Sequence, residues 1–188
     1  MIRVLLFSVL IAFFSACSGD KKDHPVQEKK MVATDFQREE LISQINENNE
    51  LISHSGNPDS VLFICHKQAE LCEQFTTTRP LDMETPKILT YQAKAYKVLQ
   101  NPQKSVQALN TIIQNFQDYE NLPEVMLVKA ITIDQEINDK QAAEKAYLEL
   151  IQKFPDHPFA NDAKSLLTQL HMSDEELIRS FEAKNKKK

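Results

Sequence analysis

The chain has 188 residues, a formal net charge of −5, only two glycines and no tryptophan. Loops that cradle phosphates need glycine, and neither Gly19 nor Gly56 lies in such a motif, which argues against a P-loop or Rossmann site. Hairpin turns also favour glycine, so an all-β fold is not expected. The acidic balance argues against nucleic-acid binding.

The N-terminal stretch has the pattern of a processing signal. Arg3 is followed by the apolar run 4–14, which is too short to span a bilayer, since spanning needs about 20 apolar residues. The run ends in Phe14-Ser15-Ala16-Cys17. This resembles the lipobox of bacterial lipoproteins, in which small residues precede a lipidated cysteine; Phe14 departs mildly from the usual leucine. We therefore expect a signal peptide over residues 1–16 and lipidation of Cys17. A plain secretory peptide is the alternative.

Polar segments flank the expected folded part. Residues 17–33, in which Ser18-Gly19-Asp20 follows Cys17, predict a flexible tether. A serine after the lipidated cysteine in such lipoproteins goes with the outer membrane, whereas charged residues just beyond it resemble export tracts of surface lipoproteins. The resemblance thus implies an outer-membrane location in the cell envelope and leaves the leaflet open. The basic end 183–188 predicts a disordered tail.

Between these segments, residues 34–182 show apolar residues at helical spacing, separated by Pro, Asn, Asp and Ser. Thr34 with Gln37, and Ser173 with Glu176, fit capping boxes at the first and last helices. The expected helices cover about 34–53, 59–75, 85–99, 103–116, 123–137, 140–154 and 160–170, with another from 173. The sequence therefore predicts an all-α fold.

These helices repeat a pattern. The spacing from Ala93 to Ala130 is 37 residues and that from Leu109 to Tyr147 is 38. The presumed helix-ending residues Phe75, Phe116 and Phe154 are 41 and 38 residues apart. Small residues are expected where two helices cross closely, in first helices at Ala93 and Ala130 and in second helices at Ser105 and Ala143. A non-repetitive helical bundle is the alternative.

The small residue at 143, the aromatic four residues later and Pro155 resemble the second half of a tetratricopeptide repeat (TPR). Together with the leader, the chain resembles small TPR lipoproteins of Gram-negative bacteria. More distantly, Phe154-Pro155-Asp156 with Ala160 and Ala163 is similar to the barrel-assembly TPR lipoprotein and the TolA-binding division coordinator. The resemblance implies a TPR-like α-solenoid of about three helix pairs with a C-terminal capping helix.

The resemblance also implies a function without catalysis or cofactor. It predicts a lipid-anchored scaffold that binds an envelope protein or peptide, and no nucleic acid or small-molecule substrate. A structural component of an outer-membrane assembly or cell-division complex is one alternative, and an enzyme with an unrecognised site is another. TPR motifs define a fold and not a partner.

Metal and thiol chemistry are not indicated. Cys65 and Cys72 are seven residues apart on one expected helix, which places them about 10.5 Å apart along its axis. That separation exceeds the reach of one tetrahedral zinc site and the Cα limit of about 7 Å for a disulfide. We expect both to be reduced core residues.

The remaining candidate is a groove lined by the first helix of each pair. Lys87, Thr90, Lys94 and Lys97 project away from the expected packing side of the 85–99 helix. The matching positions of the next first helix are Glu124, Leu127, Ile131 and Asp134. A lysine stripe beside apolar residues could accept an acidic or C-terminal peptide segment. Ordinary surface lysines explain the stripe as simply.

Overall fold

The computed structural model describes residues 25–173, 175–176 and 178–179, with side chains from residue 34 onward. The predicted signal peptide, Cys17, the first part of the tether and the tail 183–188 lie outside the described residues. The chain divides into two units, residues 1–36 and 37–188. The packing described below lies within the second unit.

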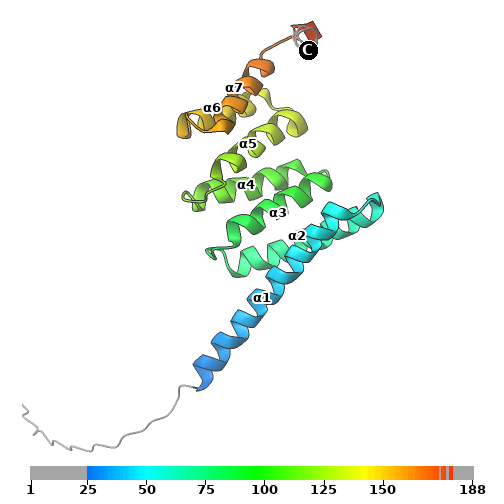
Figure 1. The fold of residues 1–188 in the computed structure, drawn as a ribbon, viewed down its shortest axis with the longest axis vertical. Helices are drawn as coiled ribbons and strands as arrows, with labels where there is room; N and C mark the ends of the chain where they lie inside the picture. The colour runs from blue at the N-terminus through cyan, green and yellow to red at the C-terminus, as the bar shows by residue number, and fades with distance from the viewer. Residues whose placement is uncertain (1–24, 174, 177, 180–188) are drawn as a thin grey trace, which may run out of the picture. The chain divides into compact units, whose positions relative to one another are not determined.

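Every element in the described part of the chain is helical, as predicted from the spacing of its apolar residues (Figure 1). Short turns that contain Pro, Asn or Asp separate the helices. The elements are α1 (Pro25–His54), α2 (Pro58–Thr78), α3 (Thr85–Val98), α4 (Pro102–Asn115), α5 (Leu122–Thr132), the π-helical η1 (Ile133–Ile137), α6 (Lys140–Lys153) and α7 (Pro158–Leu170).

The first helix begins earlier than predicted. It starts at Pro25 and not at Thr34, so Thr34 and Gln37 lie within a helix and do not cap its first turn. Residues 25–33, which the sequence analysis assigned to the flexible tether, are therefore helical. Proline is favoured in the first turn of a helix, and no other proline, and no glycine, follows until Gly56. The chain thus contains nothing to stop this helix before its predicted end.

The last predicted capping box is present. The Ser173 backbone N–H and hydroxyl donate to Glu176 Oε2 at 2.9 and 3.0 Å, and the Glu176 N–H donates to Ser173 Oγ at 3.3 Å. These bonds hold the pKa of Glu176 below its usual value. The sequence also predicts Leu177, Ile178 and Phe181 on the apolar side of this helix. Ile178 is 58% exposed, and Leu177 and Phe181 lie outside the described residues.

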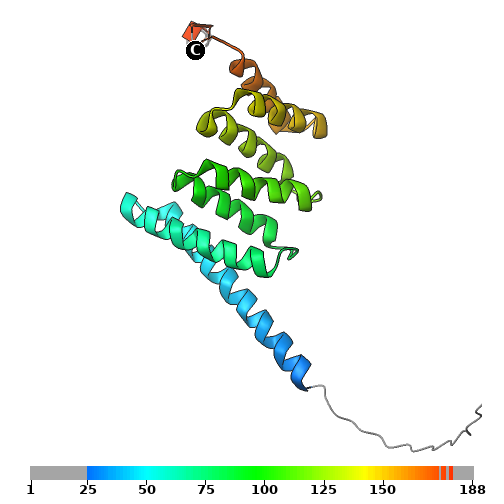
Figure 2. The same ribbon diagram turned by 180° about the vertical axis from the view of Figure 1, so that it is seen from behind.

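From α2 onward, each helix packs against the next one in the chain, and α5 also contacts α7. Figures 1 and 2 show α2 to α7 following one another in order. The largest buried cluster joins α3 through α7 and includes Leu109, Ala130, Tyr147 and Leu150. A smaller cluster joins Ile45 of α1 to α2 and α3. The apolar stripes of successive helices therefore form the core.

One turn occurs three times. It follows α2, α4 and α6, and its cap residues Arg79, Phe116 and Phe154 share nearly the same backbone angles. At each, the cap N–H donates to the carbonyl four residues earlier, and the N–H three residues later donates to the cap carbonyl. Arg79, and not Phe75, is therefore the counterpart of Phe116, which corrects the predicted spacing of 41 residues. The true spacings are 37 and 38.

The spacing between equivalent residues increases from 37 to 38, and η1 is the structural cause. At the end of α3, the hydrogen bond from the Asn101 N–H to Tyr96 O joins residues five positions apart. At the end of η1, the bond from the Asp139 N–H to Ile133 O joins residues six positions apart. Asn101 and Asp139 are equivalent, since each accepts through its side chain from the N–H three residues on. A π-helical turn is a one-residue insertion in an α-helix. The insertion at Ile133–Ile137 therefore adds the extra residue.

Candidate functional site

A groove of about 550 Å³ lies between α3 and α5 and is bounded by the turns that precede them. Its floor is apolar, with Ala93, Leu109, Val125 and Val128. Its lining residues are Met83, Glu84, Lys87, Thr90, Tyr91, Ala93, Lys94, Lys97, Leu109, Tyr119, Glu120, Asn121, Glu124, Val125 and Val128. All four residues that the sequence analysis singled out on the 85–99 helix line this groove.

The three lysines differ in their surroundings. Lys87 Nζ lies 3.7 Å from Glu84 Oε2 and 5.8 Å from the ring centre of Tyr91. Lys97 Nζ lies 2.9 Å from Glu136 Oε1, and both side chains are about one-third exposed. Lys94 is exposed, and among the described residues no carboxylate lies within ion-pair distance of it. Lys94 is therefore the cation of this groove most available to an external anion.

Thr90 is partly buried on the α3 wall, and its hydroxyl donates to Pro86 O at 2.9 Å. This bond satisfies the hydroxyl donor within the helix, a common arrangement for threonine on helices. The hydroxyl oxygen keeps acceptor capacity toward the groove.

The wall opposite α3 is acidic. Glu120 and Glu124, both exposed, come from the turn before α5 and from its first turn. The groove is thus basic along α3 and acidic along the start of α5, with apolar residues between. Carboxylates are favoured in the first turn of a helix, which explains Glu124 structurally. Residues such as Met83, Tyr119 and Glu120 were missed because they lie in turns, outside the helical periodicity.

Three of the four matching positions expected on the next first helix, Leu127, Ile131 and Asp134, do not line this groove. Leu127 is 8% exposed and belongs to the core, and Ile131 packs against that core. Asp134 accepts a hydrogen bond from the Tyr147 hydroxyl at 3.1 Å. Burial and this carboxylate together raise the pKa of Tyr147. Of the four matching positions, only Glu124 lies in the groove.

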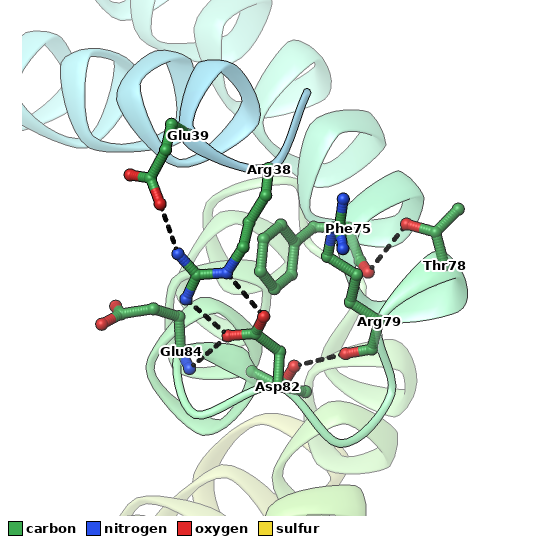
Figure 3. Close-up of polar contacts among 8 residues, drawn as sticks. Arg38, Glu39, Phe75, Thr78, Arg79, Asp82 and Glu84 are labelled. Carbon is green, nitrogen blue, oxygen red and sulfur yellow. Dashed lines mark hydrogen bonds and ion pairs between the residues drawn. The ribbon is translucent and has the colours of Figure 1, made fainter. Parts of the chain in front are cut away.

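An ion pair holds the turn at one end of the groove. Arg38 Nε and Nη2 donate to the two carboxylate oxygens of Asp82 at 2.7 and 2.8 Å (Figure 3). The same carboxylate accepts from the Glu84 N–H at 2.9 Å, and Arg38 Nη1 donates to Glu39 at 2.6 Å. The hydrogen bonds that Arg38 donates to Asp82 lower the pKa of Asp82 and raise the pKa of Arg38.

The cysteines are core residues, as predicted. Cys65 and Cys72 lie on one continuous helix, α2, and both are 0% exposed free thiols. Burial raises the pKa of both thiols, that of Cys72 to about 12. The neutral, unreactive form is therefore favoured at both positions.

Among the described residues, no cluster of three His, Cys, Asp or Glu side chains is arranged to hold a metal ion. Within the same residues, none of the helices combines the length and apolar character needed to cross a bilayer. No protein-family model matches the sequence, and a search of curated proteins finds no match.

Proposed function

We propose that this chain is a lipid-anchored, TPR-like scaffold of the cell envelope that binds a polypeptide in the groove between α3 and α5 and carries out no catalysis. The groove carries the proposal, because four residues chosen from sequence alone lie together on its lining. Its apolar floor between charged walls is the kind of surface that recognises peptide segments.

The TPR-like part of the proposal rests on the repeated turn and on small residues at crossing positions. Ala93, Ala130, Ser105 and Ala143 are at most 2% exposed, as expected where two helix backbones approach closely. Helix pairs that repeat every 37 or 38 residues, joined by the same turn, support a solenoid more than an irregular bundle.

The envelope location rests on the leader. The lipobox-like Phe14-Ser15-Ala16-Cys17 segment provides one attachment point, at Cys17. Cys17→Ser is expected to remove the protein from the membrane fraction and to abolish the acyl mass on the mature chain. Unchanged fractionation with no acyl mass on the wild-type chain would refute the anchor and leave the groove proposal standing.

Groove binding is tested by co-purification from solubilised membranes. Lys94→Glu is expected to weaken recovery of a specific envelope protein, because it places a carboxylate where the partner's anion would lie. Lys145→Glu, an exposed residue of α6 outside the groove, is the matched control. Both variants should melt within about 1–2 °C of the wild type, since exposed charges contribute little to stability. Equal recovery with both variants would refute the groove assignment.

A further inference from the structure

Two apolar side chains are exposed in the turn before α3. Leu81 is 79% exposed and Met83 is 83% exposed, the highest values among the large hydrophobic side chains of the described residues. They flank Asp82, which is held inward by Arg38. Exposed apolar patches mark interaction sites, whereas single exposed apolar residues are ordinary; here two such side chains lie within three residues of one turn.

The turn itself does not require these residues. The same turn recurs twice, and the positions equivalent to Leu81 are Asp118 and Asp156. The positions equivalent to Met83 are Glu120 and Pro158. The turn therefore forms equally well with Asp, Glu or Pro in these places, and folding gives no reason for the leucine and the methionine.

The backbone that carries the two side chains is fixed. The Thr85 hydroxyl donates to Arg79 O at 2.7 Å, and the Thr85 N–H donates to Asp82 O at 3.0 Å. Arg38 holds Asp82 through two bonds, with the Glu84 N–H on the same carboxylate (Figure 3). A fixed backbone lowers the entropy lost when a partner packs onto the side chains.

The turn is connected to the groove through Met83. Met83 lines the groove together with Glu84, Lys87 and Tyr91 on the α3 side, whereas Leu81 lies two residues earlier in the turn, outside the lining. A chain that crossed from the turn into the groove would meet apolar side chains first and then the lysines of α3. Flexible methionine side chains adapt well to apolar partners.

We propose that the 79–85 turn is an apolar docking element for the occupant of the groove. The occupant is a polypeptide segment whose apolar side chain packs on Leu81 and Met83 and whose carboxylate-bearing residues face Lys94. Basic side chains of the same segment face Glu120 and Glu124. This inference rests on the proposed groove function and adds the chemistry of the partner.

The test uses the purified full-length chain and a phage-displayed library of random peptides of about twelve residues. Selected peptides are expected to combine an apolar cluster with acidic residues on one side of it. The strongest is synthesised with a fluorescent label, and its affinity is measured by polarisation. The double variant Leu81→Ser, Met83→Ser is expected to weaken binding about tenfold or more, as loss of a central apolar anchor does. Lys94→Glu is expected to weaken binding as well.

The matched control is Asp156→Ser, in the equivalent position of the third turn, which should leave binding unchanged. All variants alter exposed residues, and circular dichroism checks that they fold. If Lys94→Glu weakens peptide binding and the double variant does not, the docking element is overturned and the groove function stands. If only the double variant weakens binding, if neither variant does, or if no peptide is selected, both proposals are overturned. Selected peptides without acidic residues would overturn the proposed partner chemistry.

Discussion

Arg38 and Asp82, 44 residues apart, are joined by two hydrogen bonds of 2.7 and 2.8 Å between a guanidinium and both oxygens of a carboxylate. Their side chains are only 20% and 14% exposed. The pair joins α1 to the turn before α3, which bounds one end of the groove.

Asp82→Asn should destabilise the protein by about 1–2 kcal/mol, the range for hydrogen bonds to charged groups. Because the pKa of Asp82 is lowered in the folded protein, the unfolded state binds more protons at acid pH. The contribution is complete above the unfolded pKa, about 3.9, and decreases as pH falls below it. Urea unfolding should therefore show a gap between wild type and variant at pH 7 that narrows below about pH 4. A gap that is constant with pH would contradict this account.

Gln100 occupies the left-handed region, with φ of 55°, as does its counterpart Asn138, with φ of 60°. Residues other than Gly, Asn and Asp are strained there. Gln100→Asn should stabilise the protein by roughly 0.5 kcal/mol, measured by urea unfolding. The exchange Asn138→Gln should be destabilising by a similar amount. Stabilisation by both, or by neither, would contradict the equivalence of the two turns.

The π-helical insertion gives a deletion test. Removing the exposed Gln135 should convert η1 to regular α-helix and keep the core of α6 and α7 in register. Removing Gln107, exposed in the regular helix α4, should rotate the residues beyond it by about 100° and disrupt the core. Circular dichroism melting should show a cooperative transition for the first deletion and none for the second. If both deletion variants fail to fold, the inserted residue of η1 cannot be removed without loss of the core packing, and the account of η1 is wrong.

The buried thiols have a pH signature. Cys72 has its pKa raised to about 12, so the unfolded state releases its proton first as pH rises through about 8.5. Stability should therefore fall in alkaline solution, and Cys72→Ala should reduce that dependence. Iodoacetamide at pH 8 should leave Cys65 and Cys72 unmodified in the folded chain and label both in urea. Rapid labelling of either in the folded state would contradict their burial.

The helices were predictable because their apolar residues recur at helical spacing and because Pro, Asn and Asp mark the breaks. The sequence did not reveal that Arg79 is the cap equivalent to Phe116, since an arginine there breaks the apparent aromatic repeat. The start of α1 was misplaced because Thr34 and Gln37 have a capping pattern, while continuous backbone hydrogen bonding extends the helix back to Pro25.

The groove was only half predictable. Lys87, Thr90, Lys94 and Lys97 share one helical face, so periodicity identified them. The opposite wall comes from the 119–124 segment, which no periodicity within α3 could indicate. The ion pair of Lys97 with Glu136 depends on where the inserted residue of η1 places that glutamate. The spacings of 37 and 38 residues show in the sequence that a residue is added, but they do not show where in the helix it is accommodated.

The most direct test of groove binding is site-specific photocrosslinking in cells that produce the full-length protein. A benzoyl-phenylalanine at Thr90, on the lining of the groove, should give a discrete adduct with an envelope protein. The same group at Gln107, exposed on α4 and outside the groove, is the matched control and should give none. Lys94→Glu in the Thr90 background should reduce the adduct. No adduct from Thr90, or one that Lys94→Glu leaves unchanged, would contradict the proposal that a polypeptide occupies this groove.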